Sequence, residues 1–497
     1  MPTMETISSS HSRFIRRRRC ALLLLLAVAA SILSACRPAV AGRRCATSEL
    51  GHDASHVLVC RGGRWQRLMT LKDAAAAIAR AKTTPAPTPA PAGTPGSAGT
   101  PGSAGTPAPA GSPGPSTARA PLGNRLAAGR DFTCAIATGG RVRCWGANER
   151  GQLGDGTTVA RNRPADVVGL ANAVSIGAEG DHACAILQPP DAAPNLWCWG
   201  ANREGVLGDG TLTDRATPVL SLGGMAVTQV SVGFAHSCAI DGVGVVQCWG
   251  LNGAGGLAAP SSLVRSLTPV PIVGPPPGVT PIVATSVAAG AQSCATYSDG
   301  SGWCWGFNNL GGLGDNSTRG TFAPWYPSSR APVPVWGLRD GAGIDAAGER
   351  GCARFLASSP AGEVLLKCWG EMSIGDVGAG EYRYTSKPFT LRDTKGVTKV
   401  AVGGGFACGV LVGGGLQCWG GGPLGLTPSV ALKAGLNFDW PRPVETSGPV
   451  VDVAAGNYHA CALLASGAVE CWGANEHGQI GQTSPTRQPT PLPVVGT

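Results

Sequence analysis

The sequence predicts an all-β fold: a closed seven-bladed β-propeller with about four short strands in each blade. Glycine and proline account for 75 and 40 of the 497 residues, which favours turns and short strands over helices. The tripeptide Cys-Trp-Gly recurs at intervals of 50 to 64 residues, without helical periodicity between the copies. Its seven copies begin at Cys144, Cys198, Cys248, Cys304, Cys368, Cys418 and Cys471.

Each repeat contains the same segments in the same order. In the first repeat a strand of small residues ends at Gly129, a hairpin follows over residues 132–146, and a Pro-containing strand covers 164–169. A loop rich in Gly, Asn and Asp joins the hairpin to the Pro strand. Four short strands repeated radially are typical of a propeller blade.

The ends of the repeat array predict how the ring closes. No Pro strand precedes Leu126, and no small-residue strand follows the Pro strand that ends at Thr497. We therefore expect the N- and C-terminal segments to pair and to share one blade, which would leave no exposed end edges.

The spacing of the cysteines predicts one disulfide per blade. The two Cys of a hairpin are 10 residues apart in five repeats, and 14 and 16 apart in the other two. Even insertions keep the same two residues opposite each other and on one side of the hairpin. Metal binding is disfavoured because the repeats contain no Cys-x-x-Cys. The predicted bonds are Cys134–Cys144, Cys184–Cys198, Cys238–Cys248, Cys294–Cys304, Cys352–Cys368, Cys408–Cys418 and Cys461–Cys471.

The N-terminus predicts export. Arg16 to Arg19 precede an apolar stretch of 13 residues, which is too short to span a bilayer, so residues 1–35 are predicted to be a signal peptide. Leu-Ser-Ala-Cys36 resembles a bacterial lipobox, which implies lipidation of Cys36 and, with Arg37 after it, anchoring at the outer membrane. The alternative is cleavage after Ala41, which would release a soluble periplasmic or secreted protein.

Two further segments precede the propeller, which is predicted to span residues 121–497. Residues 36–82 predict a small module with a Cys45–Cys60 disulfide, a hairpin turning at Arg61-Gly-Gly, and a short helix. Residues 83–120 consist almost entirely of Pro, Ala, Gly, Thr and Ser and predict a disordered linker.

The repeat resembles that of a known family. Its motifs are Gly-x-x-His-x-Cys-Ala-Ile followed by Gly-x-Val-x-Cys-Trp-Gly-x-Asn-x-x-Gly-Gln-Leu-Gly-Asp-Gly-Thr, over roughly residues 122–497. These motifs are similar to the regulator of chromosome condensation repeat, which implies a seven-bladed propeller. The paired Cys and the export signal set this chain apart as a bacterial, exported member. They argue against the exchange-factor and chromatin roles of the founding member.

The charge argues against a nucleic-acid partner. The formal charge of +9 falls to +5 without residues 1–35, since 34 basic and 29 acidic residues remain. No concentrated Lys/Arg stripe is present.

Several repeated residues have a structural explanation that is simpler than a site. The Trp of each Cys-Trp-Gly is predicted to pack between blades. Gly-Asp-Gly at 154–156 and 208–210 is explained by turn chemistry rather than by cation binding. His recurs two positions before the first Cys, but the mixture of residue types there disfavours a metal or catalytic ring. We therefore expect no catalytic residue, no metal and no cofactor. The residues at this position are Phe132, His182, His236, Gln292, Arg350, Phe406 and His459.

Two loops that break the repeat pattern are the candidate partner surface. They occupy the same slot, ahead of the Pro strands of the fourth and fifth repeats, and aromatic and Arg side chains in such loops are typical interface anchors. Local packing of long loops is the alternative. The candidate residues are Trp325, Tyr326, Arg330, Tyr382, Arg383 and Tyr384.

The predicted function is binding. We expect an exported, lipid-anchored, monomeric propeller that engages another protein or a surface glycan and is not an enzyme. The alternatives are inhibition of a secreted enzyme and a propeller enzyme acting on polysaccharide. The enzyme alternative predicts a central cleft lined by paired carboxylates. Nucleotide exchange on a small GTPase would require a cytoplasmic protein.

Overall fold

The computed structural model describes nine segments of the propeller and four short strands ahead of it. The propeller segments are 123–274, 282–317, 327–356, 364–372, 383–391, 393–422, 425, 438–483 and 486–497. The chain divides into two compact units, Met1–Pro113 and Gly114–Thr497. No helix within the described residues is long and apolar enough to cross a membrane.

The first unit contains a small sheet. Its strands are β1 (Arg37–Pro38), β2 (Leu50–His52), β3 (His56–Arg61) and β4 (Arg64–Thr70), paired in sequence order. The predicted hairpin is present, since Arg61 pairs with Arg64 across the turn. Cys36, the signal peptide, the predicted short helix, residues 83–120 and the Cys45 partner of the predicted Cys45–Cys60 bond lie outside the described residues.

The second unit contains seven four-stranded antiparallel sheets, each made of consecutive strands. Blade one comprises β5 (Leu126–Ala128), β6 (Phe132–Ile136), β7 (Val142–Gly146) and β8 (Arg161–Asp166). Blade two comprises β9 (Ala173–Glu179), β10 (His182–Leu187), β11 (Asn195–Gly200) and β12 (Arg215–Leu220), followed by the 3₁₀ turn η2 (Leu222–Gly224). Blade three comprises β13 (Val227–Val232), β14 (His236–Asp241), β15 (Val246–Leu251) and β16 (Arg265–Pro271). Blade four comprises β17 (Ala284–Ala289), β18 (Gln292–Tyr297), β19 (Gly302–Gly306) and β20 (Ser329–Pro334).

The last three blades repeat this plan. Blade five comprises β21 (Gly341–Ala347), β22 (Arg350–Leu356), β23 (Val364–Met372) and β24 (Arg383–Thr390). Blade six comprises β25 (Val397–Val402), β26 (Phe406–Leu411), β27 (Leu416–Gly420) and β28 (Phe438–Val444). Blade seven comprises β29 (Val450–Ala455), β30 (His459–Leu464), β31 (Val469–Ala474) and β32 (Arg487–Pro493). The predicted seven-bladed fold is confirmed.

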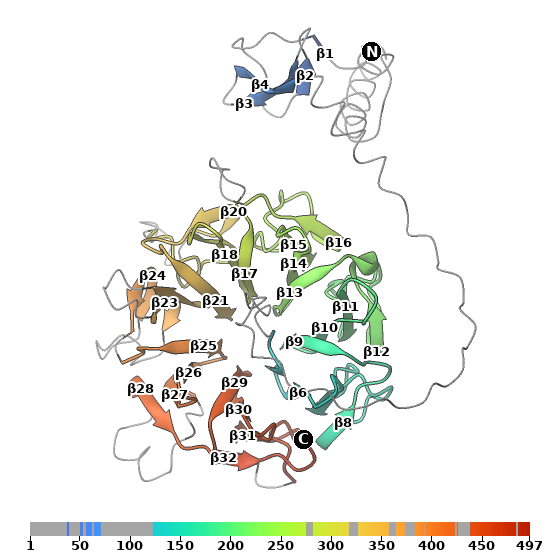
Figure 1. Ribbon diagram of the computed structural model, residues 1–497, viewed down its shortest axis with the longest axis vertical. Helices are drawn as coiled ribbons and strands as arrows, with labels where there is room; N and C mark the ends of the chain where they lie inside the picture. The colour runs from blue at the N-terminus through green and yellow to red at the C-terminus, as the bar shows by residue number, and fades with distance from the viewer. Residues whose placement is uncertain are drawn as a thin grey trace, which may run out of the picture. The chain divides into compact units, whose positions relative to one another are not determined.

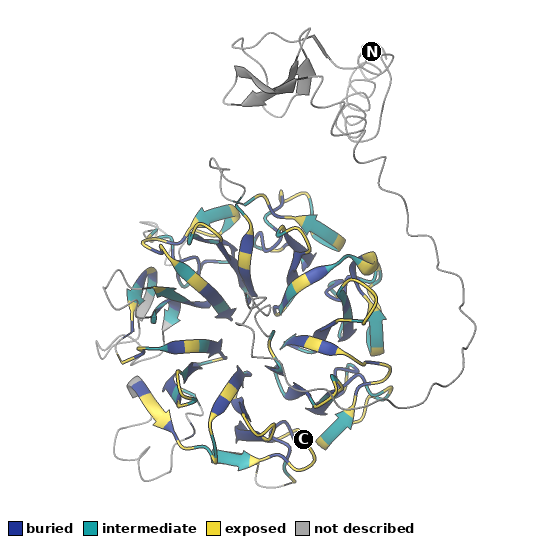
Figure 2. Cartoon of the chain, in the orientation of Figure 1, coloured by how far each residue is buried: buried dark blue, intermediate teal, exposed yellow. Residues whose placement is uncertain are grey.

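The small-residue strands lie around the centre of the ring and the Pro strands lie outside (Figure 1). The outer position suits proline, because a strand that pairs on one side only does not need every backbone N–H. Burial follows the same order: β10 is buried along its whole length, whereas β8 is exposed or half-buried (Figure 2).

Each blade presents its connections on two faces of the ring. We call the loop face the one that carries the connections between the first and second strands and between the third and fourth strands. The turn face carries the hairpin turns between the second and third strands. The antiparallel order of every sheet places the small-residue and Gly-rich loops together on the loop face.

The prediction that the two chain ends share one blade is wrong. The last Pro strand, β32, pairs with β31 of its own blade, and β5 pairs with β6. A Pro strand belongs to the hairpin that precedes it, so blade one needs no strand ahead of Leu126. The N- and C-terminal segments nevertheless meet, since Asp452 Oδ2 accepts the backbone N–H of Arg125 at 2.6 Å.

The structure confirms all seven predicted disulfides of the propeller. The two Cys of each hairpin are direct partners across the strands, as with Cys184 and Cys198 of the longer hairpin in blade two. Their Cα atoms are 4.0 to 4.1 Å apart, and no described cysteine is free. The even insertions in blades two and five preserve this register.

The core lies between adjacent blades, as the Trp prediction requires. Trp199 of blade two packs with Phe132 and Leu153 of blade one, and Trp145 packs with Ile480 of blade seven. The Nε1–H of Trp199 donates to the Gln152 carbonyl of the preceding blade at 2.9 Å. The buried indole of Trp199 therefore satisfies its one polar group on the neighbouring blade. The seven side chains are 0 to 3% exposed: Trp145, Trp199, Trp249, Trp305, Trp369, Trp419 and Trp472.

Candidate functional site

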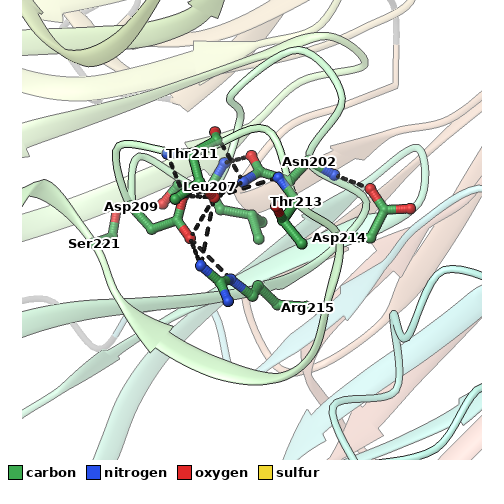
Figure 3. A network of polar contacts seen from close by, with 8 residues as sticks. All are labelled: Asn202, Leu207, Asp209, Thr211, Thr213, Asp214, Arg215 and Ser221. Carbon is green, nitrogen blue, oxygen red and sulfur yellow. Dashed lines mark hydrogen bonds and ion pairs between the residues drawn. The ribbon is translucent and has the colours of Figure 1, made fainter.

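In blades one and two, a buried asparagine stabilises the loop between the third and fourth strands. In blade two, Asn202 Oδ1 accepts the Leu207 N–H at 3.0 Å, and Asn202 Nδ2 donates to Asp209 Oδ1 at 3.0 Å and the Thr211 carbonyl at 3.1 Å (Figure 3). The same contacts recur around Asn148 of blade one. The repeat motif contains this asparagine, but its role is not apparent from the sequence.

The aspartate of Gly-Asp-Gly completes the loop. Asp209 Oδ1 accepts the Thr211 N–H at 2.9 Å, and Asp209 Oδ2 lies 2.8 Å from Arg215 Nη2 (Figure 3). Burial would raise the pKa of Asp209, but hydrogen bonds from Thr211 and Arg215 outweigh it and hold that pKa below its usual value. These contacts agree with the predicted turn chemistry. Within the described part of the chain, no group of three His, Cys, Asp or Glu could hold a metal ion.

The three histidines ahead of the first Cys join neighbouring blades. His236 Nε2 lies 2.6 Å from Ser293 Oγ of the next blade, and that hydroxyl donates to the Gly256 carbonyl at 3.2 Å. His236 must therefore carry its proton on Nε2 and donate it. His182 and His459 make the same contact, to Ser237 and Thr133 respectively.

Burial keeps these histidines neutral. It lowers the pKa of His236 and of His459 to about 4, and burial together with the charge of His236 lowers the pKa of His182 to about 3. Because each ring bonds to a different hydroxyl one blade away, the three do not form one site.

The structure describes the candidate partner surface only in part. Trp325, Tyr326 and Tyr382 lie outside the described residues, and Arg383 and Tyr384 are described only as backbone of β24. The strands that flank these two segments, β19 with β20 and β23 with β24, are the third and fourth strands of adjacent blades. Arg330 is exposed but donates to the Gly253 carbonyl at 2.8 Å, which ties blade four to blade three.

All seven blades contribute residues to a central bowl on the loop face. It encloses about 420 Å³. Most of its wall is Gly and Ala, and Phe234 and Phe307 supply its aromatic surface. We define the central bowl by one or two residues from each blade: Arg130, Glu179, Phe234, Phe307, Gly348, Gly404 and Asn457.

The rim of the bowl is cross-linked between blades and carries an exposed aromatic ring. The Arg130 backbone N–H donates to the Gly180 carbonyl at 2.8 Å. The Arg130 guanidinium lies 5.3 Å from the centre of the Phe234 ring, and its Nη1 lies 3.3 Å from Asp181 Oδ2. Phe234 is 61% exposed. Exposed aromatic side chains next to Arg are typical anchors of protein interfaces.

A narrow channel continues below the bowl between the inner strands. The backbone N–H groups at the inner edges of these strands have no neighbouring strand to bond. They donate instead to polar side chains of the preceding blade. Ser231 Oγ accepts the Ala289 N–H at 2.9 Å, and Asp345 Oδ2 accepts the Val402 N–H at 2.9 Å. Asp452, which also pairs with Lys399, accepts from Arg125 in the same way.

Glu179 differs from these channel residues. It ends β9, where the bowl meets the channel, and lines both. No described residue makes a hydrogen bond or ion pair with its carboxylate. Burial and the charge of Asp345 raise the pKa of Glu179 to about 8, against a smaller opposing effect of Arg130. Burial also raises the pKa of Asp345 to about 6.

Family models of the regulator of chromosome condensation repeat match residues 125–152, 139–186, 195–240 and 450–479. The chain therefore contains regulator of chromosome condensation repeats. These matches fall on blades one, two, three and seven, and the structure extends the same blade plan to the other three.

Relatives of this family cover most of the chain. The ultraviolet-B receptor UVR8 of Arabidopsis thaliana is 29% identical over 370 residues, which are 72% of this chain and 78% of that protein. The secretion-regulating guanine nucleotide exchange factor of Bos taurus is 24% identical over 387 residues, 73% of this chain and 80% of that protein. The E3 ubiquitin-protein ligase HERC2 of Homo sapiens is 27% identical over 371 residues, but they make up 7% of its length.

Solved structures show the same fold. Prp20p of Saccharomyces cerevisiae, whose structure is titled with its binding to Gsp1p and histones, has a TM-score of 0.59 at 21% identity and covers 74% of this chain and 86% of its own. Human WBSCR16 has a TM-score of 0.59 at 20% identity and covers 71% of this chain and 94% of its own.

Proposed function

We propose that this chain is an exported binding propeller whose loop face engages another protein, with the central bowl as its anchor. The observation that carries the proposal is that all seven blades converge on one concavity with an exposed aromatic at its rim. Relatives named as a receptor and as an exchange factor are consistent with a binding role for such propellers.

The test is capture of a partner by the disulfide-bonded protein and by two variants. Phe234→Ala should abolish capture with little cost in stability, because the ring is 61% exposed. Val412→Ala is the matched control, since Val412 is 75% exposed in a hairpin turn of the turn face. A third variant combines Trp325→Ala, Tyr326→Ala and Tyr382→Ala. Capture that survives both loop-face variants would contradict the proposal, and retention on a glycan array instead would assign a surface glycan as the ligand.

Export is supported by the chemistry of the cysteines. All 14 repeat cysteines are paired, and disulfides persist in oxidising compartments. Lipidation of Cys36 predicts incorporation of labelled fatty acid that Cys36→Ser abolishes. An unlabelled, soluble product that begins at residue 42 would instead establish cleavage after Ala41.

A second candidate function, hydrolysis of a polysaccharide, is favoured by one observation. Glu179 and Asp345 place two carboxyl groups of raised pKa in the central channel, as the enzyme alternative requires. Release of reducing sugar from a polysaccharide panel that is lost in Glu179→Gln would support it. Equal release by the parent and the variant would reject Glu179 as a catalytic residue.

A further inference from the structure

We infer that the central bowl receives a basic side chain of the partner, a Lys ammonium or an Arg guanidinium, which pairs with the carboxylate of Glu179. This inference rests on the proposed protein-binding function and specifies the chemistry of the residue that enters the bowl. The proposed ligand is a cationic side chain on a polypeptide loop, not a free metal ion.

The first step is that no described residue forms an ion pair with Glu179, and Arg130 offsets its carboxylate only in part. Three described cations line the bowl or the channel, and each is committed elsewhere. Arg130 pairs with Asp181, Lys399 pairs with Asp452, and Arg354 donates to the Ala342 carbonyl at 2.9 Å. A half-buried carboxylate without an ion-pair partner is unfavourable, so a ligand that supplies a positive charge should bind there.

The second step is that Glu179 is not needed to complete the fold. Ser231, Asp345 and Asp452 each accept a backbone N–H from the next blade, which is the structural role of a polar residue on an inner strand. Glu179 accepts none from any described residue. It stands instead at the end of β9, next to Gly180, and faces the open bowl.

The third step is that the bowl fits a long basic side chain. Its walls are lined by Gly180, Gly290, Gly348 and Gly404, so the backbone of a partner loop meets few side chains on its way in. Phe234 and Phe307 line the path to Glu179. Aromatic faces stabilise both the alkyl stem and the charged head of Lys and Arg.

The pairing makes binding depend on pH. A cation favours the ionised form of Glu179, so binding below the pKa of about 8 must release a proton, and affinity should rise between pH 6.5 and pH 8.5. The charged groups that act on Glu179 are Asp345 from β21 and Arg130 from the loop after β5. His236, which also lines the bowl, has its pKa lowered to about 4 by burial and stays neutral throughout this range.

The experiment uses the full disulfide-bonded chain and two blocked pentapeptides, Gly-Gly-Arg-Gly-Gly and Gly-Gly-Gln-Gly-Gly, with ligand-observed NMR as the readout. The Arg peptide should bind about tenfold more tightly at pH 8.5 than at pH 6.5. At pH 8.5 it should also bind about tenfold more tightly than the Gln peptide, which corresponds to about 1.4 kcal/mol. Glu179→Gln should remove both differences, whereas Glu149→Gln, an exposed carboxylate on the same face, should keep them.

Folding of Glu179→Gln is checked by its melting temperature, which should not fall, because the carboxylate has no described partner to lose. Equal binding of the two peptides to the parent protein, or a Glu179→Gln variant that still prefers the Arg peptide, would overturn the inference. If Phe234→Ala loses the partner while Glu179→Gln keeps it, the protein-binding function stands. The inference that a basic side chain of the partner pairs with Glu179 is then wrong. If Phe234→Ala, the triple variant and Glu179→Gln all keep the partner, both proposals fail.

Discussion

Replacing His236 by Gln should make the stability of the protein less dependent on pH. The ring donates from Nε2 to Ser293 Oγ at 2.6 Å between blades three and four. Blade four supplies the natural substitute, since Gln292 stands at the same repeat position and donates its Nε2–H to the Arg350 carbonyl at 2.8 Å. At pH 7.5 the variant therefore keeps a donor and should lose about 1 kcal/mol or less.

The expected effect at acid pH follows from the lowered pKa. His236 titrates near its ordinary 6.5 when unfolded and near 4 when folded. Its contribution is therefore complete above pH 6.5 and is lost as the pH falls toward 4, because protons then bind to the unfolded chain first. A gap of 2.5 pKa values corresponds to about 3 kcal/mol, taken as an upper limit. Glutamine does not titrate. As the pH falls, the unfolding free energy of the variant should therefore rise relative to that of the parent by up to this amount.

The assay is urea unfolding of parent and variant at pH 7.5, 6.5, 5.5 and 4.5 with the disulfides intact. The difference between the two proteins isolates His236, because the opposite pH dependence of Glu179 and Asp345 is common to both. His477→Gln is the matched control, since its side chain is 45% exposed. A difference in unfolding free energy that stays constant across this range would refute the assignment of a buried, neutral His236.

Three further predictions concern the blade scaffold. Replacing both Cys of Cys238–Cys248 by Ala should cost about 2–3 kcal/mol in urea unfolding, and the wider Cys352–Cys368 pair should cost about 0.4 kcal/mol more; the reverse order would contradict the loop-entropy account. Trp249→Phe should cost about 1 kcal/mol, because the Val206 carbonyl loses the indole N–H at 2.7 Å but keeps the Ser237 hydroxyl at 3.1 Å. Asn202→Ala should raise amide exchange at Leu207, whose N–H it holds at 3.0 Å, and unchanged exchange there would contradict its role.

The sequence was sufficient for the features that repeat. Seven copies of one motif defined the number of blades, and the even insertions between Cys184 and Cys198 and between Cys352 and Cys368 fixed the disulfide register. These inferences succeed because they are local: side chains alternate along a strand whatever surrounds the hairpin. Burial of the Trp followed from the same repetition, since a large apolar residue in every blade needs a neighbour in the next.

Ring closure was beyond the sequence, because a cyclic repeat can be divided into units at any point. Only the pairing of β32 with β31 shows that each Pro strand completes the preceding hairpin.

Glu179 was missed for a related reason. Its one signal is spacing: Gly177 lies five residues before His182, whereas Gly233 lies three before His236, and Glu179 falls in the extra length. No local sequence pattern indicates that these extra residues end beside the channel. Nor does it indicate that Asp345, 166 residues further along the chain, lines the same channel. The sequence by itself determined the blade, its disulfide and the number of copies. Only the tertiary structure decided what meets at the centre, because closing the ring brings together residues from blades that are distant along the chain.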